Sequence, residues 1–271
     1  MARKYINLNP VTSFEQFKDV YKQISDLDLN FYKEAQMKRR IHNFMLNNGF
    51  HDNYTDFLDN LNVNETLFDS FFKHLTINVT QFFRDTGHWD SFINKIVPDL
   101  MKSRKTLKLW SAGCSSGQEP YTLAMIFAEH FPDVNYTILA TDIDNKVLVQ
   151  AKAGVYTSRD FATPQPNLVE KYMTQKSGDT YEVKDILRRS ISFRSHNLLI
   201  DDFPTNMDFI ACRNVVIYFT EEAKSDLYRK FVQALSPEGV LFTGSTEHIF
   251  GAAEIGLKSK TPFFYYRAAP V

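Results

Sequence analysis

The sequence predicts an α/β fold in which an all-helical N-terminal domain precedes a parallel sheet. Three observations support this prediction. Through about the first hundred residues, apolar side chains recur at spacings of three and four, as on one face of a helix. From Thr106 onward, short apolar runs alternate with helical patterns, which is typical of parallel strands joined by right-handed crossovers. A mixed, polar stretch from Gly154 to about Ser190 interrupts this alternation and predicts an excursion from the sheet.

Composition narrows the class of protein. The 271 residues, 44% hydrophobic and 23% charged, are enough for one large domain or two modest ones. Lys and Arg number 31 against 32 Asp and Glu, which excludes a globally basic nucleic-acid binder but not a local basic patch. No apolar run approaches the roughly 18 residues of a membrane span. Residues 1–10 lack the apolar core of a secretory signal, and there are only two cysteines, so we expect a reduced, cytoplasmic protein.

Five helices are expected before the sheet begins. Asn30, Thr55 and Asn64 are placed to cap the second, third and fourth of them. Pro98 falls inside the fifth and should kink or shorten it. The apolar positions expected to face inward are Phe14, Phe17, Val20, Tyr21, Ile24, Tyr32, Ala35, Ile41, Phe44, Met45, Leu67, Phe68, Phe71, Phe72, Leu75, Trp89, Phe92, Ile93, Ile96, Val97 and Leu100.

The sheet region has a regular order of elements. Expected strands are 107–111, 136–141, 191–193, 209–212, 240–244 and 263–266, with helices at about 119–131, 146–152 and 221–235. A turn at 237–239 should divide the last helix from the strand that follows it. The excursion should hold a short helix, 167–173, and a small strand, 180–183.

A glycine-bearing turn follows the first expected strand, where open α/β sheets usually bind ligands. Its spacing, Gly113-x-x-x-Gly117, is neither a dinucleotide fingerprint nor a phosphate loop. Glu119 then stands at the helix start, where an anion site would want no carboxylate. The combination suits a ligand that carries positive charge, such as an amine or a sulfonium. The alternative is that both glycines only shape a tight turn.

Polar residues also follow two further expected strands. Asp142 ends the second strand, where a carboxylate can accept hydrogen bonds from ribose hydroxyls. Asp is also a good helix N-cap, and Asp144 is placed to be one. Arg213 and Asn214 follow an apolar strand and should face a ligand or partner. Tyr218 offers a hydroxyl near the same edge, unless it is a buried tyrosine satisfied by backbone.

The segment 78–85 joins the helical region to the sheet region. Phe82 and Phe83 can anchor it while Asn78, Thr80 and Arg84 point elsewhere. The alternative is a simple helix start capped by Thr80. The residues alone do not decide between the two.

Together these motifs resemble a known family. The segments 78–84, 110–121, 142–144, 212–219 and 242–247 occur in the order seen in the CheR-type chemotaxis receptor methyltransferases, and the resemblance covers nearly the whole chain. It implies a Rossmann-like methyltransferase domain with a small inserted β-subdomain, behind an all-α domain. It also implies transfer of a methyl group from S-adenosylmethionine to glutamate carboxylates of bacterial chemoreceptors, with S-adenosylhomocysteine as the product.

The resemblance assigns roles residue by residue. Glu119 would receive the charged amino-acid end of the cofactor and Asp142 its ribose, with Gly113 in the turn beside them. Arg84 and Tyr218 would lie nearest the transferring methyl. Arg84 could orient either the substrate carboxylate or that of the cofactor. The remaining expected cofactor contacts are Asn78, Thr80, Asn197, Leu198, Arg213 and Asn214. No histidine or cysteine spacing predicts a metal site.

The resemblance also implies a domain organisation. We expect a receptor-docking helical domain at 1–85, a linker to about 105, and a methyltransferase domain at 106–271 with the β-subdomain at about 155–190. Some members grip a C-terminal pentapeptide of the receptor with this subdomain and a glycine-bearing insertion. The corresponding stretch here, 174–181, is short and holds one glycine, so we expect no pentapeptide tether.

A basic cluster on the second helix, Lys33, Lys38, Arg39 and Arg40, would ordinarily be a solvated face. Because receptor methylation helices present glutamates, the cluster Lys38, Arg39 and Arg40 becomes a candidate docking surface. Two alternatives remain. One is a methyltransferase of the same fold that acts on a small molecule, and the other is a non-catalytic adaptor.

Overall fold

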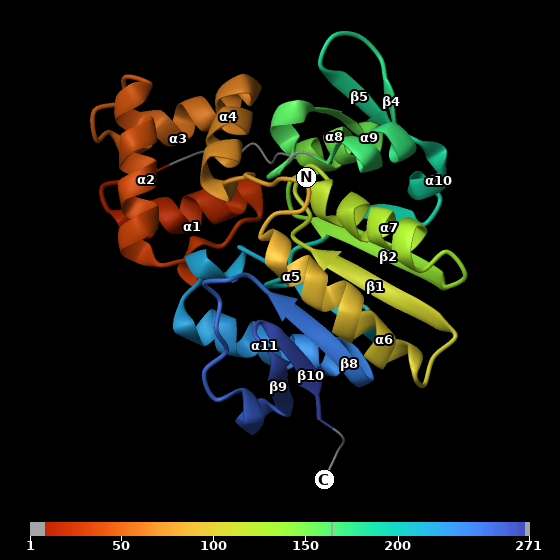
Figure 1. The fold of residues 1–271 in the computed structure, drawn as a ribbon. Helices are drawn as coiled ribbons and strands as arrows, with labels where there is room; N and C mark the ends of the chain where they lie inside the picture. The colour runs from red at the N-terminus through yellow and green to blue at the C-terminus, as the bar shows by residue number, and fades with distance from the viewer. Residues whose placement is uncertain (1–8, 164, 269–271) are drawn as a thin grey trace. The chain divides into compact units, whose positions relative to one another are not determined.

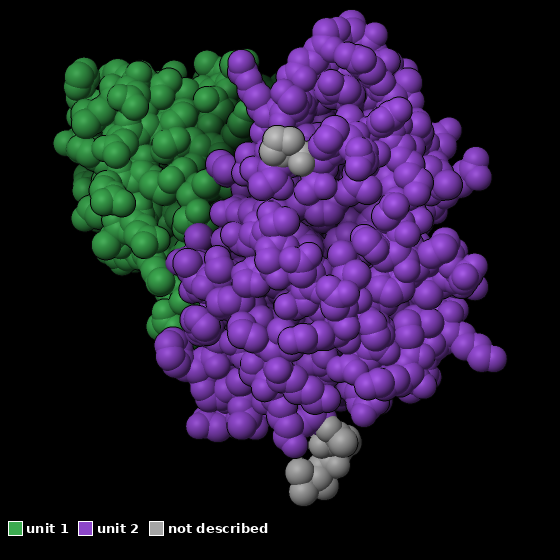
Figure 2. All heavy atoms as spheres, viewed as in Figure 1, with its two compact units in different colours: residues 1–78, 218–224 green, residues 79–217, 225–271 purple. Residues whose placement is uncertain are grey.

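The structure, a computed structural model, describes residues 9–163 and 165–268. It divides into two compact units, which Figure 2 colours separately. The helical unit extends to Asn78 and includes Tyr218–Lys224, and the sheet unit comprises Val79–Ile217 and the residues from Ser225 onward. Most of the stretch considered for a secretory signal, residues 1–8, lies outside the described residues. In the described ranges, no helix is long and apolar enough to cross a membrane.

The helical unit is held together by aromatic packing between its helices. These are α1 (Phe14–Ser25), the short η1 (Leu29–Phe31), α2 (Glu34–Asn47), α3 (Tyr54–Val63) and α4 (Glu65–Thr76). Phe17, Phe57 and Phe71, from three different helices, are fully buried. Their ring centroids lie 4.9–6.5 Å apart, in stacked and edge-on pairs that aromatic rings favour. The predicted all-helical N-terminal part is confirmed.

One of the three predicted helix caps is correct. Asn64 caps α4, since its side chain accepts the N–H of Leu67 at 3.0 Å. Asn30 does not cap α2, because it lies inside η1, where it donates its N–H to the cap residue Asp28. Asn30 is therefore part of this short turn and not the start of α2.

The third cap and one inward position are also corrected. Asn53, rather than Thr55, caps α3, because the hydroxyl of Thr55 instead accepts the N–H of Val11 at 2.8 Å. On α2, Ala35 is exposed and Met37 is buried. The helix begins later than expected, at Glu34, and its inward face is set by its packing partners.

The sheet unit confirms the predicted α/β fold. Among the described residues its main sheet has seven strands, in the order β6-β2-β1-β7-β8-β10-β9. The neighbours from β6 to β8 pair in parallel, and β10 pairs antiparallel with β8 and β9. The strands are β1 (Thr106–Ala112), β2 (Asn135–Asp142), β6 (Ile191–Ser195), β7 (Met207–Cys212), β8 (Leu235–Thr243), β9 (Leu257–Thr261) and β10 (Phe264–Arg267). The strand β9 was not predicted.

Helices cover both faces of this sheet (Figure 1). On one face Phe92 packs against Phe127 and Phe209, and on the other Trp110 of β1 packs against Phe231 at 5.6 Å. The helices concerned are α5 (Thr86–Ser91), the π-helical turn η2 (Phe92–Ile96), α6 (Val97–Met101), α7 (Gln118–His130), α8 (Asn145–Ala153) and α11 (Glu221–Ala234). Pro98 lies in the first turn of α6, directly after the π-helical turn, so the predicted long helix is interrupted there.

The inserted subdomain lies between α8 and β6 in the chain. Its strands β3 (Val155–Thr157), β5 (Thr180–Val183) and β4 (Met173–Gln175) form an antiparallel sheet, in that order. Its short helices are η3 (Ser158–Asp160), α9 (Pro166–Tyr172) and α10 (Asp185–Arg188). The fold therefore contains the small β-subdomain that was expected in the excursion.

The expected turn at 237–239 does not separate helix from strand. Strand β8 already begins at Leu235, which pairs with Met207, and its register shifts before Val240 pairs with Phe209. Glu238 has a φ of 60°, the left-handed conformation of a bulge residue. The strand thus passes through the turn sequence as an irregularity, and the boundary prediction was wrong.

Candidate functional site

The glycine turn after β1 leaves no room for larger residues. Gly113 and Gly117 have φ values of 85° and 96°, which side-chain-bearing residues rarely adopt. A Cβ on Gly113 would lie 2.5 Å from Cγ2 of Val215, and one on Gly117 would lie 2.8 Å from Cβ of Ala151. The N–H groups of Gly113 and Cys114 both donate to the carbonyl of Thr141 at the end of β2. The turn therefore packs against the end of β2, against Val215 after β7 and against Ala151 of α8.

Asp142 lies at the centre of these strand ends. One of its oxygens accepts the N–H of Ser115 at 2.8 Å, and the other accepts that of Asp144 at 3.0 Å. Burial raises the pKa of Asp142 to about 6, despite these N–H donors, which favour the ionised form. Helix α8 is capped by Asp144 instead, whose side chain accepts the N–H of Lys146. The cap of α8 is therefore Asp144, as expected, and not Asp142.

The segment that carries Arg84 is anchored by its two phenylalanines. Phe82 is fully buried and stacks on Phe161 at 4.5 Å, while the N–H of Phe83 donates to the hydroxyl of Thr122 at 3.1 Å. Phe83 and Asp85 have φ values of 53° and 57°, so the backbone is held in the left-handed region on both sides of Arg84. Such a conformation persists only where neighbouring contacts enforce it.

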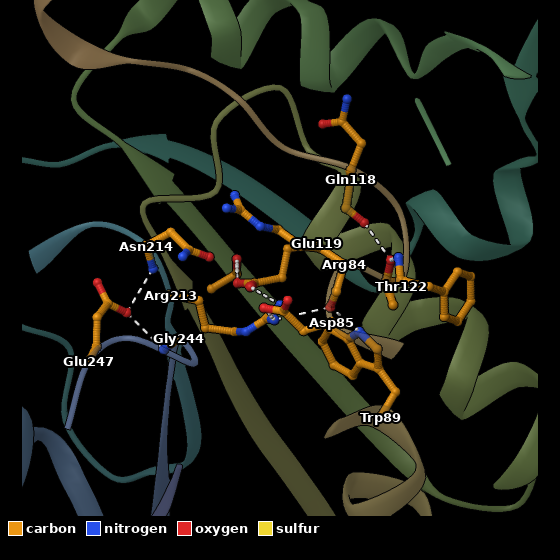
Figure 3. Close-up of polar contacts among 12 residues, drawn as sticks. Arg84, Asp85, Trp89, Gln118, Glu119, Thr122, Arg213, Asn214, Gly244 and Glu247 are labelled. Atoms are coloured by element: carbon orange, nitrogen blue, oxygen red, sulfur yellow. Dashed lines mark hydrogen bonds and ion pairs between the residues drawn. The ribbon is translucent and has the colours of Figure 1, made fainter. Parts of the chain in front are cut away.

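Arg213 supplies those contacts (Figure 3). Its guanidinium is nearly inaccessible and donates to the carbonyl of Arg84 at 3.0 Å and to a carboxylate oxygen of Asp85 at 2.8 Å. The same group lies over the rings of Trp89 and Phe242, at 5.3 and 4.6 Å. Arg213 thus ties the end of β7 to the segment around Arg84.

Glu119 is the second carboxylate of the site. It stands in the first turn of α7 and accepts a hydrogen bond from Ser111 Oγ at 2.7 Å. Its other oxygen accepts a longer bond, 3.4 Å, from Arg213 (Figure 3). Each carboxylate oxygen has a second lone pair, so Glu119 can accept further donors.

The loop after β7 is held by a residue that follows β8, Glu247. Glu247 is buried, and its carboxylate accepts the N–H groups of Asn214 and Gly244, both at 2.7 Å (Figure 3). It also accepts the N–H of Val216 at 3.0 Å. Glu247 belongs to the motif at 242–247, but no role was predicted for it.

The predicted cofactor contacts that follow β6, Asn197 and Leu198, also lie near a strand end. His196, which precedes Asn197, donates its N–H to the carbonyl of Asp142 at 2.9 Å. Asn197 and Leu198 are buried, and the side-chain oxygen of Asn197 accepts the N–H of Leu199. Contacts within the sheet unit thus place Arg84, Gly113, Glu119, Asp142, Arg213, Asn214, Asn197 and Leu198 at one edge of the sheet.

Three predicted site residues are not part of this group at the sheet edge. Asn78 and Tyr218 belong to the helical unit, where Asn78 donates to Thr76 Oγ1 and the carbonyl of Tyr218 accepts the N–H of Lys33. Thr80 is half-buried at the start of the sheet unit. Their roles at the cofactor stay predictions.

The basic cluster on α2 is less uniform than expected. Lys38 and Arg39 are exposed. Arg40 is half-buried, and its guanidinium donates to the carbonyl of His74 on α4. Arg40 therefore joins two helices, and only Lys38 and Arg39 remain as fully exposed members of the proposed docking cluster.

Some of the connecting residues were missed by sequence analysis. Asp85, Trp89 and Ser111 hold Arg213, Arg84 and Glu119 in place, yet no sequence pattern marked them for this task. Ser115 lies within the glycine turn, and its buried hydroxyl has no hydrogen-bond partner among the described residues. A buried group of this kind is typical of a site that a ligand completes.

Comparison with known proteins identifies the class. Residues 78–263 match the CheR methyltransferase SAM-binding domain, and residues 12–76 match the CheR methyltransferase all-alpha domain. With the parallel sheet and the acidic strand ends, these matches define an S-adenosylmethionine-dependent methyltransferase. The chain belongs to the CheR methyltransferase family.

Individual relatives agree with this assignment. The chain is 41% identical to a chemotaxis protein methyltransferase of Listeria monocytogenes, over 93% of this chain and 95% of the relative. It is 34% identical to one of Borreliella burgdorferi, over 91% of each. A solved structure of PKMT2 from Rickettsia typhi with AdoHcy overlaps 51% of this chain and 21% of its own at 16% identity and a TM-score of 0.33, which is too low to carry an argument.

These findings confirm the predicted family, fold, enzyme class and cofactor, and the predicted methylation of chemoreceptor glutamates. The residues present fit S-adenosylmethionine: the half-buried carboxylate of Glu119 and the buried one of Asp142 have spare lone pairs that suit an ammonium and ribose hydroxyls. Ser115 Oγ and Arg213 Nε are buried and unpartnered in the described chain. Among the described residues, no cluster of histidine, cysteine and acidic side chains could hold a metal ion.

Proposed function

We propose that Glu119, Asp142 and the strand-end residues around them bind the S-adenosylmethionine from which this enzyme methylates chemoreceptor glutamates. The observation that carries this proposal is a pair of carboxylates at one edge of the sheet: Asp142 ends β2, and Glu119, in the first turn of α7, is hydrogen-bonded to Ser111 near the end of β1. In open α/β sheets this edge, where the strand order reverses, is the usual ligand site. Here the order reverses between β1 and β7, beside Gly113 and Arg213.

Each residue has a distinct task in this proposal. Glu119 holds the ammonium group of the cofactor, and Asp142 accepts the ribose hydroxyls. Asn197 and Leu198 line the adenine side, while Arg213 and Asn214 form the floor together with Gly113. Asn78 and Thr80 contribute from the segment that leads to Arg84. Arg213 serves mainly through its contacts, because its guanidinium is already engaged by Asp85, Glu119 and the carbonyl of Arg84.

The reaction requires no general base. When bound, S-adenosylmethionine supplies a methyl group on a positively charged sulfur. A glutamate side chain has an ordinary pKa of about 4.3, so its carboxylate is already a nucleophile at neutral pH. The enzyme contributes by holding that carboxylate in a reactive position, which in favourable models supplies roughly 7–11 kcal/mol. We assign this positioning to Arg84 and Tyr218.

We further propose that the helical unit binds the receptor's cytoplasmic methylation helices through Lys38 and Arg39. Exposed cations steer an acidic partner into contact and are screened by salt. The β-subdomain supports a tether-free mode, because β4 and β5 are joined by a tight turn at 176–179. In that turn Lys176 and Thr180 pair through their backbones. The turn is short and holds one glycine, Gly178, so we expect it to lack the longer insertion that grips a receptor tail.

Charge reversal tests this docking mode. The double variant Lys38→Glu with Arg39→Glu should slow receptor methylation while cofactor affinity stays unchanged, and rising salt should slow the wild type in the same way. The matched control is Lys105→Glu with Lys108→Glu, which makes the same charge change at exposed positions beside the start of β1. Deleting the receptor's last five residues should have little effect. Unchanged methylation by the first variant, together with loss on tail deletion, would instead assign docking to the β-subdomain.

A further inference from the structure

Glu247 is a buried carboxylate to which the proposed cofactor site assigns no role. It is 3% exposed, and none of the described cationic side chains forms an ion pair with it. An ionised group in such a place is costly unless hydrogen bonds compensate for its lost hydration. The compensation comes entirely from backbone N–H groups, in the loops that follow β7 and β8.

The two loops are brought together by this one side chain. Strands β7 and β8 are parallel neighbours, and Cys212 pairs with Thr243 at their ends. Beyond this pair the strand pairing ends, and the N–H groups of Asn214, two residues past Cys212, and of Gly244 both donate to one oxygen of Glu247 at 2.7 Å. The carboxylate therefore links the two loops in place of further backbone hydrogen bonds between the strands (Figure 3).

The local geometry is adapted to this contact. Asn214 has a φ of 59°, a conformation that turns its N–H away from an extended strand. A Cβ on Gly244 would lie 2.6 Å from a carboxylate oxygen of Glu247 and 3.0 Å from the nitrogen of Asn214. Any larger residue at position 244 would push the carboxylate away from both loops.

The fixed loop in turn contacts two parts of the cofactor site. Arg213 precedes Asn214 and donates to Glu119 and to the carbonyl of Arg84. Val215 follows it, and its side chain occupies the space beside the α-carbon of Gly113. A displacement of this loop would move both the guanidinium and the wall of the glycine turn.

We propose that Glu247 is a positioning residue for methyl transfer, whose carboxylate locks the loops after β7 and β8 so that Arg213 and Val215 hold the cofactor site in its binding geometry. This inference rests on the proposed cofactor site. It assigns Glu247 no contact with the cofactor or the substrate.

The carboxylate form is required, because all of the groups that face it are donors. In Glu247→Gln the amide oxygen can accept from Asn214 and Gly244, but the amide NH2 then faces the N–H of Val216. We expect cofactor affinity to fall on the order of tenfold, as for loss of one hydrogen bond to a charged group. The variant Gly244→Ala should weaken binding in the same direction, since it displaces the carboxylate without removing it.

A control distinguishes positioning from plain stabilisation. Asp208 is also a buried carboxylate, which accepts from Ser236 Oγ and the N–H of Lys108, but it lies at the opposite, amino end of β7. Asp208→Asn should lower the melting temperature and leave the cofactor dissociation constant unchanged. Glu247→Gln should lower the melting temperature and also raise the cofactor dissociation constant. The dissociation constant is measured at a temperature where circular dichroism shows that the protein is folded.

The experiment is calorimetric titration of S-adenosylhomocysteine into the full-length variants, with turnover measured on receptor membranes. Weaker binding in Glu247→Gln or Gly244→Ala, with Asp208→Asn unchanged, supports the inference. Wild-type affinity and turnover in folded Glu247→Gln and Gly244→Ala overturn it. Glu119→Gln separates this failure from that of the proposed site: if Glu119→Gln binds as tightly as wild type the cofactor site itself is wrong, and if only Glu119→Gln is impaired, Glu247 is not a positioning residue.

Discussion

Arg213 and Glu119 form an ion pair across 3.4 Å that joins the end of β7 to the first turn of α7. The same guanidinium holds Asp85 at 2.8 Å, so Arg213 keeps a closer anionic partner when Glu119 is engaged elsewhere. This arrangement leaves Glu119 available to a cationic ligand, because the pair is the longer of the two contacts and each oxygen of Glu119 has a spare lone pair.

Replacing Glu119 by Gln should therefore weaken cofactor binding with little loss of stability. The amide cannot provide the negative charge that an ammonium group requires, and losing a hydrogen bond to a charged group typically costs about 1.5–3 kcal/mol, or roughly tenfold or more in affinity. Arg213 remains paired with Asp85 in this variant. Isothermal titration calorimetry measures the affinity, and an unchanged dissociation constant would remove Glu119 from the site.

Cofactor binding should depend on pH through Asp142. Burial raises the pKa of this carboxyl from 3.8 to about 6, so the free enzyme protonates it in mildly acidic solution. A protonated carboxyl is a poorer acceptor for ribose hydroxyls, and affinity should fall by about tenfold per pH unit below the pKa if only the ionised form binds. Titrations between pH 5 and 8 should show this loss in the wild type, and Asp142→Asn should show a flat profile over the same range.

The stability of the free enzyme should respond to Asp142 in the opposite sense from an ordinary carboxylate. Between pH 3.8 and about 6 the native state binds one more proton at this site than the unfolded chain does. Its contribution therefore declines as the pH rises through about 6, and the ionised group costs about 3 kcal/mol above that pH. Thermal melts with and without cofactor should show a cofactor-induced stabilisation that is larger at pH 7.5 than at pH 5. Equal stabilisation at both pH values would contradict the role of Asp142.

The Tyr218 hydroxyl should affect turnover more than binding. If it acts on the reacting groups, Tyr218→Phe removes an interaction made in the transition state and lowers kcat while cofactor affinity stays near the wild-type value. Tyr172→Phe is a suitable control, because the Tyr172 hydroxyl donates to Glu129. Normal turnover by Tyr218→Phe would make Tyr218 a packing residue.

The order of helices and strands could be predicted because it depends on short-range patterns. The strand β5 was predicted at its observed bounds, and Asn64 and Asp144 were identified as candidate caps from local sequence. Competing caps could not be ranked: Asn53 and Thr55 are both good caps, and only the contact of Thr55 with Val11 decides between them. Local patterns specify what a residue can do, and tertiary contacts select among those options.

The site was predictable to a similar degree. Glycines, an acid at a strand end and a family motif indicated where the cofactor should bind. The support of that site was not predictable, because Arg213 contacts Asp85 across 128 residues of the chain and Glu247 contacts Asn214 across 33. Arg213 was expected simply to line the site, and no periodic pattern marks a buried acid such as Glu247 that accepts three backbone N–H groups.

Transfer of labelled methyl groups tests the central claim most directly. The enzyme is incubated with methyl-labelled S-adenosylmethionine and membranes that contain chemoreceptors, and the products are then treated with base. We predict label on the receptor that base releases, as expected for glutamate methyl esters, and its loss when the receptor's methylated glutamates are replaced by alanine. Label on a small molecule instead, or no transfer by an enzyme that binds the cofactor, would contradict the account.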